Sequence, residues 1–247
     1  MQSGGKKSMR LDLVFTHQEL QFTDTRGKTG VVIDVLRATT TAVTAINNGC
    51  ASFTPITTVD ETRERSKKFA IGTVLLGGAK NGIKPEGFDV GNSPLDYVRE
   101  VVEGKHILFS SSNGTQAMHR LKGSEEILIA SFLNTMAISR EILNARRDSL
   151  IACSGDFGRF SLADTVCGGM IISKLQSEMK SEMRLSETAA VALMVFEAHH
   201  HDIRGMLYAS EWGQRLIQLN MSADLDFCAR VDQTEISPRF RNGIVAL

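Results

Sequence analysis

A carboxylate, a guanidinium and a run of hydroxyls follow one another closely near the start of the chain. Asp34 lies inside a run of mostly β-branched apolar residues, 31–36, and Arg37 follows it, ahead of three consecutive threonines at 39–41. The apolar run predicts a buried strand, and the segment after Arg37 has the pattern of a helix. Free N–H groups and hydroxyls at a helix N-terminus bind anions, and a guanidinium binds phosphate or sulfonate as a planar fork. This stretch therefore predicts an active site for a small, highly charged anion.

Asp34 has a structural alternative beside the functional one. A carboxylate in an apolar strand loses hydration unless something pairs with it, coordinates it or protonates it. The structural alternative is a helix cap or a buried acid that pairs with Arg37, as structural ion-pair networks often do. The functional alternative is metal ligation or acid–base chemistry. We favour function because an apolar run surrounds Asp34 and an anion-binding turn follows it.

Two later turns repeat the order of strand, polar turn and helix. The turn at 110–115 reads Ser-Ser-Ser-Asn-Gly-Thr, and the turn at 154–161 contains Arg159, a candidate anion clamp. A long glycine-rich loop at 77–94 follows a further predicted strand, and loops of this length are usually functional. In open α/β sheets, ligands bind beyond the carboxyl ends of the strands. We therefore expect the three turns to converge on one cleft.

Short apolar runs alternate with amphipathic segments along the chain, which is typical of α/β proteins. We expect a layered α/β/α structure with a mostly parallel or mixed sheet, with two α/β subdomains that share a cleft as an alternative. Residues 1–10 are predicted to be a flexible leader and residues 11–247 to form the folded domain. The predicted strands are 12–16, 31–36, 52–56, 73–76, 106–109, 127–130 and 150–153. The predicted helix starts are Thr58, Ser93 with Pro94, Asn134 and Ser161, and a longer helix covers 187–200.

The composition excludes several classes of protein. The 247 residues contain 28 Lys+Arg and 28 Asp+Glu, which argues against nucleic acid or an anionic membrane as the main partner. No apolar run approaches the roughly 20 residues of a membrane span, and residues 1–9 lack the apolar core of a secretory signal. The four cysteines have no CxxC spacing, as expected of reduced thiols. We expect a cytoplasmic protein without nucleic-acid or membrane partners; the sequence does not decide whether it is a homo-oligomer.

Two conspicuous features are assigned structural roles. Histidines 199–201 follow an apolar helical segment, and adjacent helix positions point in different directions, so we interpret them as a solvated helix end. Cys153 belongs to an apolar strand and Cys167 to the following helix, so both are predicted to be core residues rather than nucleophiles. Neither GxxxxGK[ST] nor GxGxxG after a strand occurs, so the nucleotide-binding fingerprints are missing.

Four motifs in register resemble the 2-phosphosulfolactate phosphatase (ComB) family. They are Asp-Val-Leu-Arg-Ala-Thr-Thr-Thr at 34–41, Gly-Phe-Asp-Val-Gly-Asn-Ser-Pro at 87–94, Ser-Asn-Gly-Thr at 112–115, and Cys-Ser-Gly at 153–155 with Arg-Phe-Ser-Leu at 159–162 and Asp164. The resemblance implies an α/β enzyme that uses Mg²⁺ to hydrolyse the phosphate ester of 2-phospho-3-sulfolactate to 3-sulfolactate and phosphate, in the route to coenzyme M. Such a substrate carries phosphate, sulfonate and carboxylate on three carbons, which agrees with several anion-binding turns in a small space.

The resemblance and the residue types together give a candidate site. Asp34 and Arg37 are the catalytic candidates. Mg²⁺ prefers carboxylate and water oxygens, which suits Asp34 with a second acid such as Asp89 or Asp164. The candidate substrate-binding residues lie in the polar turns and the long loop: Thr39, Thr40, Lys80, Asn92, Ser112, Asn113, Gly114, Thr115, Ser154, Gly155 and Arg159. The small anionic substrate is the expected partner.

Two positions depart from the family pattern. Ala79 and Lys80 stand where the family usually has glutamate and arginine, and Ala163 stands where a glutamate often precedes the aspartate aligned with Asp164. Lys80 keeps the positive charge but loses the bidentate fork. These departures leave open which acids ligate the metal, and allow a phosphatase for another small phosphorylated acid. A non-catalytic binder of sulfonated or phosphorylated acids, which would need no metal, is the alternative from another class.

Overall fold

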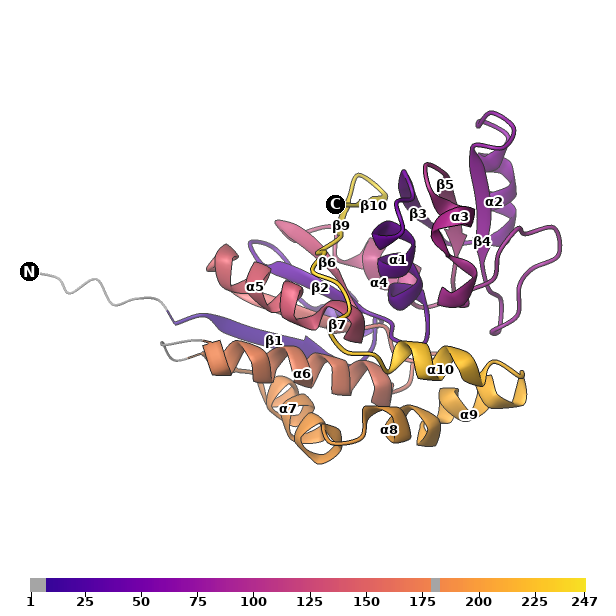
Figure 1. Ribbon diagram of the computed structural model, residues 1–247. Coiled ribbons are helices and arrows are strands. Elements are labelled where there is room, and N and C mark those ends of the chain that lie inside the picture. Colours follow the sequence, from indigo (N-terminus) through magenta and orange to yellow (C-terminus); the bar gives the residue numbers. More distant parts are fainter. Residues whose placement is uncertain (1–7, 179–182) are drawn as a thin grey trace, which may run out of the picture.

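The computed structural model describes residues 8–178 and 183–247, which form a ten-stranded sheet in the order β4-β5-β3-β10-β9-β6-β2-β7-β1-β8 (Figure 1). The strands are β1 (Arg10–Val14), β2 (Thr29–Ile33), β3 (Ser52–Ile56), β4 (Val74–Gly78), β5 (His106–Ser110), β6 (Glu126–Ala130), β7 (Ser149–Cys153), β8 (Arg184–Leu185), β9 (Arg239–Arg241) and β10 (Ile244–Ala246). The predicted α/β class and mixed sheet are confirmed. Strand β1 begins at Arg10, the last residue of the predicted leader, and residues 1–7 of that leader lie outside the described residues.

Helices cover both faces of this sheet. They are α1 (Ala38–Asn47), α2 (Val59–Ser66), α3 (Arg99–Val102), α4 (Gly114–Arg120), α5 (Thr135–Ala145), α6 (Leu162–Glu178), α7 (Glu187–His199), α8 (Ile203–Ala209), α9 (Glu211–Gln218) and α10 (Ser222–Cys228), with 3₁₀ helices η1 (Glu19–Phe22), η2 (Pro94–Asp96) and η3 (Phe132–Asn134). In Figure 1, α6 and α7 lie side by side, and α8, α9 and α10 extend from them toward the β4 end of the molecule. Within 8–178 and 183–247, no helix has both the length and the apolar character needed to cross a membrane.

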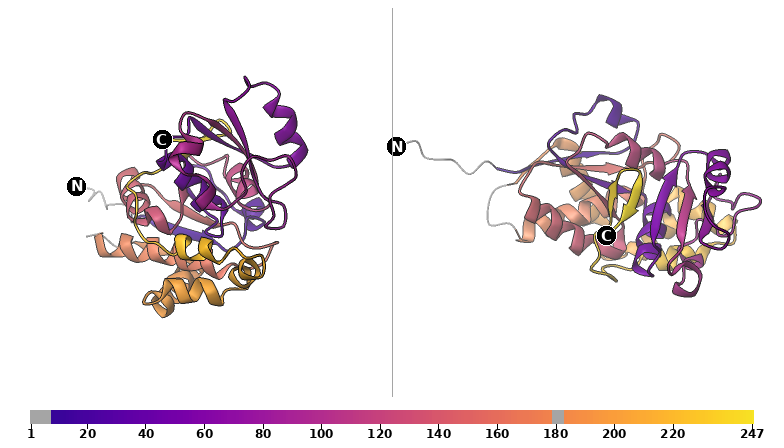
Figure 2. Two further views of the ribbon diagram at one scale, coloured as in Figure 1. Left: turned by 45° about the vertical axis from the view of Figure 1, so that its right-hand side comes forward. Right: turned by 90° about the horizontal axis from the view of Figure 1, so that it is seen from above.

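Two groups of parallel strands are joined by an antiparallel hairpin. Strand β2 pairs in parallel with β6 and β7, and β5 pairs in parallel with β3 and β4. The hairpin of β9 and β10 lies between the two groups, where Arg239 pairs with Leu128 of β6 and Val245 pairs with Phe53 of β3 (Figure 2). The sequence analysis missed β8, β9 and β10, because strands of two or three residues are too short to show an alternating pattern.

Strand β2 places Asp34 at a rigid position. All five of its residues are buried. Val31 and Ile33 belong to the hydrophobic cluster beneath α5, α6 and α7, whereas Val32 belongs to the cluster that includes side chains of α1 and α4. Each fully buried aliphatic side chain stabilises the fold by about 1.5–3 kcal/mol. Packing on both faces therefore holds the strand, and with it the turn that follows.

Two of the predicted helix starts are present as expected. The Thr58 hydroxyl accepts a 3.1 Å hydrogen bond from the backbone N–H of Glu61, which caps α2. The Ser161 hydroxyl accepts a 3.3 Å bond from the N–H of Asp164 and precedes α6. The Ser161 bond matters for the site, because it orients the first turn of α6, which carries Asp164.

The other two predicted starts belong to short 3₁₀ helices instead of the expected α-helices. The helix expected from Ser93 is split into η2 and α3, because the chain leaves helical geometry at Tyr97. The side chain of Asn134 does not cap α5; it accepts from the N–H of Ser131 and donates to the carbonyl of Ile129. Ser93 still caps η2, since its hydroxyl accepts a 3.3 Å hydrogen bond from the N–H of Leu95, and at the other place Ser131, not Asn134, is the capping residue, of η3.

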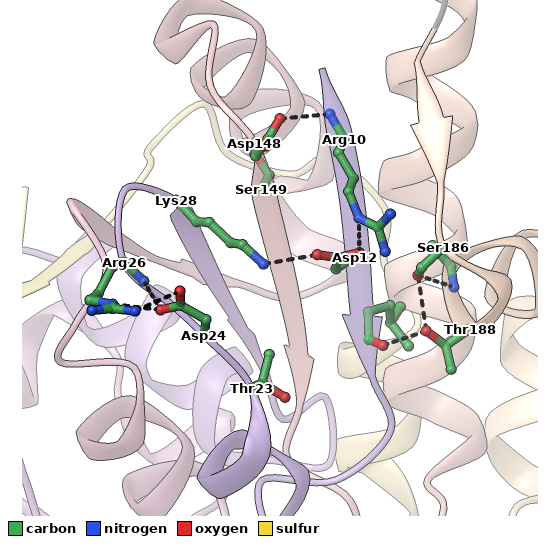
Figure 3. A network of polar contacts seen from close by, with 12 residues as sticks. Arg10, Asp12, Thr23, Asp24, Arg26, Lys28, Asp148, Ser149, Ser186 and Thr188 are labelled. Atoms are coloured by element: carbon green, nitrogen blue, oxygen red, sulfur yellow. Dashed lines mark hydrogen bonds and ion pairs between the residues drawn. The ribbon is translucent and has the colours of Figure 1, made fainter. Parts of the chain in front are cut away.

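A polar network joins the amino ends of β1, β2 and β7 (Figure 3). The Asp12 carboxylate accepts hydrogen bonds from Arg10 Nε at 2.8 Å and from Lys28 Nζ at 2.9 Å. Asp148, just before β7, accepts a 2.9 Å bond from the backbone N–H of Arg10. These charged groups lie at the opposite ends of the strands from Asp34, so they belong to the framework and not to the candidate site.

The features assigned structural roles occupy structural positions. Helix α7 ends at His199, and His200 and His201 are exposed, as expected of a solvated helix end. Cys153 and Cys167 are both free thiols with 0% of their surface exposed, and both belong to the hydrophobic core.

Candidate active site

A pocket lies where the carboxyl ends of β2, β5 and β7 meet the loop after β4. Its walls come from the three polar turns, from the 77–94 loop and from the segment at the start of α9. The lining residues are Asp34, Leu36, Arg37, Ala79, Asn81, Gly82, Asn92, Ser111, Ser112, Asn113, Gly155, Asp156, Phe157, Arg159, Phe160, Ser161, Leu162, Ala163, Asp164, Ser210, Glu211 and Trp212. The predicted convergence of the three turns on one cleft is confirmed.

Asp34 is held between β2, α1 and α4. Its Oδ1 accepts a 3.2 Å hydrogen bond from the backbone N–H of Ala38, and its own N–H donates to Thr39 Oγ1 at 2.9 Å. Gly114 packs against the carboxylate so closely that a Cβ there would lie 2.7 Å from Oδ2. Burial removes hydration from the ionised carboxylate and raises the pKa of Asp34 to about 6. A group with this pKa and position changes readily between the charged and neutral forms.

Asp164 brings a second buried carboxylate to the same pocket. Its Oδ1 accepts a 2.8 Å hydrogen bond from the N–H of Val35, and its Oδ2 accepts a 3.2 Å bond from the N–H of Gly155. Burial, together with the negative charge of Asp34, raises the pKa of Asp164 well above its ordinary value. Two desolvated carboxylates that repel each other are stabilised by a bound cation or by a shared proton.

Arg37 has a partner that the sequence analysis did not find. Its Nη1 pairs with Asp224 Oδ2 at 2.5 Å, and its Nη2 donates to the carbonyl of Gly82 at 2.9 Å. Asp224 lies on α10, and its Oδ1 accepts a 2.6 Å bond from the Ser93 hydroxyl. Arg37 thus pairs with Asp224, and the alternative ion pair with Asp34 is not formed. The Nε of Arg37 is buried and has no hydrogen-bond partner in the part of the chain that the structure describes.

A tight turn and the start of α9 form the rim of the pocket. Asp156 and Arg159 exchange backbone hydrogen bonds of 2.9 and 2.8 Å, which closes a turn with Phe157 at its tip. The ring of Phe157 lies 5.9 Å from that of Trp212, centroid to centroid. Burial, and then the negative charge of Glu211, raise the pKa of Asp156. The rim therefore combines an aromatic contact with two further carboxylates.

The predicted site residues fall into two groups. Those that line the pocket are Asp34, Arg37, Asn92, Ser112, Asn113, Gly155, Arg159 and Asp164. Those that lie outside its lining are Thr39, Thr40, Lys80, Asp89, Gly114, Thr115 and Ser154. The second group includes residues that support the pocket from behind and residues that the fold directs elsewhere.

Several hydroxyls of the second group are engaged with the protein itself. The hydroxyl of Thr40 donates to the carbonyl of Val35 at 2.8 Å, and that of Thr39 accepts from the N–H of Asp34. The hydroxyl of Thr115 shares a 3.0 Å hydrogen bond with that of Ser111. These side chains stabilise the turns from behind the pocket lining. The prediction from hydroxyl-rich turns therefore included more substrate-binding residues than line the pocket.

Asp89 and Lys80 lie away from the two buried carboxylates. Asp89 is exposed, and its Oδ2 accepts a 2.7 Å hydrogen bond from the backbone N–H of Leu76. Lys80 is exposed beside Ala79, which lines the pocket. The structure thus brings Asp164, and not Asp89, to Asp34. Among the described residues, no group of three or more His, Cys, Asp or Glu side chains forms a ready-made metal cage.

Sequence reasoning left several residues of the pocket and its support out of the predicted site, among them Asp156, Glu211, Trp212 and Asp224. Asp156 lies within a predicted turn, but a lone acid in a polar turn carries no distinct signal. Glu211, Trp212 and Asp224 come from short helices near the C-terminal end, where the sequence shows helical periodicity and no motif. Only the packing of these helices against the ends of the strands brings them to the site.

The fold and the pocket define an α/β protein with an acidic ligand site beyond the carboxyl ends of its strands. The family model for 2-phosphosulpholactate phosphatase matches residues 14–243. A Clostridium acetobutylicum protein named probable 2-phosphosulfolactate phosphatase is 34% identical over 235 residues, which is 95% of this chain and 99% of the relative. A Thermotoga maritima protein of the same name is 39% identical over 220 residues, 89% of this chain and 92% of the relative. The chain belongs to the 2-phosphosulpholactate phosphatase family, as the four motifs predicted.

Proposed function

We propose that this protein is a Mg²⁺-dependent phosphatase that hydrolyses the phosphate ester of 2-phospho-3-sulfolactate to 3-sulfolactate and phosphate, the type of reaction found in coenzyme M biosynthesis. The observation that carries the proposal is the pair of buried carboxylates, Asp34 and Asp164, in one pocket with Arg37 and Arg159. Family membership and the names of the relatives support the phosphatase reaction and its substrate. The proposal includes a cytoplasmic location.

The charge of the pocket supports a metal requirement. Four carboxylates line it, Asp34, Asp156, Asp164 and Glu211, and of its two guanidinium groups that of Arg37 is paired with Asp224. An ester that carries phosphate, sulfonate and carboxylate groups would be repelled by such a lining unless cations or protons offset the negative charge. A divalent cation between substrate and carboxylates would remove this repulsion.

The donor set fits Mg²⁺. This ion is usually bound through one or two carboxylates and keeps several waters together with substrate phosphate oxygens. Asp34 and Asp164 would hold it, since backbone N–H groups already orient both carboxylates in the pocket. Bound there, Mg²⁺ would neutralise phosphoryl charge and lower the pKa of a bound water.

The other residues of the pocket would bind and orient the substrate. Arg37 and Arg159 supply donors for anionic groups, and Ser112 and Asn113, which line the same pocket, supply short polar side chains. Asp156, whose pKa burial raises, lies at the rim and is the candidate to deliver a proton to the alkoxide oxygen that leaves as the phosphate ester breaks.

Phosphate release from purified protein tests this proposal. The substrates are 2-phosphosulfolactate and two other small phosphorylated acids, 2-phospholactate and 3-phosphoglycerate, each with Mg²⁺ and with EDTA. We expect turnover of 2-phosphosulfolactate that EDTA abolishes and Mg²⁺ restores. Preference for another acid would replace the substrate, activity in EDTA would reject the metal requirement, and binding of 3-sulfolactate without any turnover would favour a non-catalytic binder.

A further inference from the structure

We propose that Asp224 is a positioning residue for anion binding: it holds the Arg37 guanidinium by its Nη1 edge and leaves the Nε donor for the substrate. This inference rests on the proposed function, because it takes the ligand to be an anionic ester. It assigns a role in the site to α10, a helix that lies far along the chain from the motif that contains Arg37.

Both carboxylate oxygens of Asp224 form hydrogen bonds, and each bond connects α10 to a segment of the pocket wall. Oδ2 pairs with Arg37 Nη1 at 2.5 Å, and Oδ1 accepts the Ser93 hydroxyl at 2.6 Å. Asp224 and Arg37 are each 2% exposed, so water does not compete for these bonds. Ser93 follows Asn92, which is one of the residues that line the pocket. One carboxylate therefore anchors two segments of the pocket wall.

Of the three guanidinium nitrogens of Arg37, Nε alone has no hydrogen-bond partner among the described residues, while Nη1 also donates to the sulfur of Met221 at 3.1 Å. Nη1 is directed to Asp224 and Nη2 to the carbonyl of Gly82, which together fix the plane of the guanidinium. The Nε–H is buried without an acceptor among the described residues, although Arg37 belongs to the pocket lining. Buried donors are nearly always paired, and leaving one unpaired is costly. An oxygen of a bound anion would supply the missing acceptor.

The pairing also changes what Arg37 offers to a ligand. With Asp224 at contact distance, the charge of the guanidinium is balanced within the protein. Arg37 then contributes a directed N–H group more than a long-range attraction, and direction depends on orientation. Loss of Asp224 would free the guanidinium to rotate toward other carboxylates of the pocket, and the ligand would lose its aligned donor.

A double-mutant cycle on phosphate affinity tests this role. Binding of inorganic phosphate and of 3-sulfolactate is measured by calorimetry for wild type, Asp224→Asn, Arg37→Lys and the double variant, together with KM and kcat. We expect Asp224→Asn to weaken binding and raise KM by about tenfold, with a smaller effect on kcat. In the Arg37→Lys variant, the further change Asp224→Asn should weaken binding by only about twofold or less, because the effects of coupled residues are not additive. A role of Asp224 that does not act through Arg37 would give additive losses.

Two further variants control for folding. Asp226→Asn removes a carboxylate from the same helix, where it pairs with exposed Arg204 at 2.7 Å, and should leave affinity and KM within about twofold of wild type. Ser93→Ala keeps the Asp224 charge and removes one anchor, so it should shift KM in the direction of Asp224→Asn, and it serves if Asp224→Asn does not fold.

The outcomes separate this proposal from the function on which it rests. Wild-type affinity in Asp224→Asn, or in Ser93→Ala if that variant has to replace it, would overturn the positioning role while the phosphatase function stands. Additive losses of affinity in the double-mutant cycle, or an equal loss of affinity in Asp226→Asn, would also overturn the positioning role. A wild-type protein that neither hydrolyses the ester nor binds phosphate or 3-sulfolactate would overturn both.

Discussion

The carboxylate of Asp164 accepts a hydrogen bond of 2.8 Å from the backbone N–H of Val35. This bond joins the first turn of α6 to the residue that follows Asp34. It therefore holds the carboxylates of Asp34 and Asp164 in the same pocket. Burial is the main cause that raises the pKa of both; the charge of Asp156 adds to the rise for Asp34, and the charge of Asp34 adds to the rise for Asp164. Two buried carboxylates in one pocket destabilise the protein when nothing is bound, and a bound cation would offset this cost. Functional sites often carry such a cost in stability.

Asp34→Asn should abolish most activity without loss of thermal stability. Burial raises the folded-state pKa of Asp34 to about 6 from an ordinary 3.8, so at pH 8 the ionised carboxylate lowers the stability of the fold. An amide of the same shape removes this cost but gives Mg²⁺ a poorer ligand. We expect kcat/KM to fall by about two orders of magnitude or more, and the Mg²⁺ concentration for half-maximal activity to rise.

Thermal unfolding at pH 8 checks the metal contribution separately from activity. Mg²⁺ should raise the Tm of wild type, since a ligand that binds the folded state stabilises it, and should raise that of Asp34→Asn much less. Equal Mg²⁺-induced shifts in the two proteins would show that Asp34 is not a metal ligand.

Arg37→Lys should impair catalysis while the fold survives. Lysine can keep an ion pair with Asp224, but it cannot also donate to the carbonyl of Gly82 and present an Nε–H. We expect kcat/KM to fall at least about tenfold, mainly through KM. Arg204→Lys, at an exposed pair with Asp226, is the matched control and should behave as wild type. Near-wild-type kcat/KM in Arg37→Lys, with a normal melting curve, would remove Arg37 from the site.

Cys153→Ser and Cys167→Ser should each retain a substantial part of the activity. Burial raises the pKa of both thiols well above the ordinary value, so neither is a thiolate near neutral pH, and neither lines the pocket. Losses should follow Tm. Mass spectrometry of quenched reactions should find no phosphocysteine. A folded but inactive variant, together with a trapped phosphocysteine in wild type, would replace attack by water with a covalent mechanism.

His17 should make stability fall in mild acid. Burial, and then the charge of Arg120, lower the pKa of His17 to about 4 from an ordinary 6.5. Between these values the unfolded chain binds the proton and the folded protein does not, so stability is lost as pH falls from 6.5 to 4. Urea unfolding at pH 7 and 4.5 should show a smaller loss for His17→Gln than for wild type. His201→Gln, at an exposed position, should lose as much unfolding free energy between pH 7 and 4.5 as wild type does. Equal losses in all three proteins would contradict the prediction.

The sequence by itself determined the strand-turn-helix units and the chemistry of their turns. The apolar run before Asp34 and the polar residues after it are neighbours in the chain, so their pattern is visible without any tertiary contact. The same holds for the turn at 154–161 and for the cap of Ser161, which places Asp164 on α6. Local patterns of this kind also predicted the α/β class and the family.

Only the tertiary structure decided which polar groups face the ligand and which face the protein. Thr40 donates to the backbone of its own turn, and Asp89 is bonded to Leu76, although both have residue types suited to the site. Arg37 takes Asp224 from the far end of the chain as its partner. A hydroxyl or carboxylate has the same hydrogen-bonding capacity in either role, and its direction depends on packing between segments that are distant in sequence. Composition and spacing therefore predicted which chemical groups the pocket contains. The packing of α10 against the ends of the strands determined which residues line it.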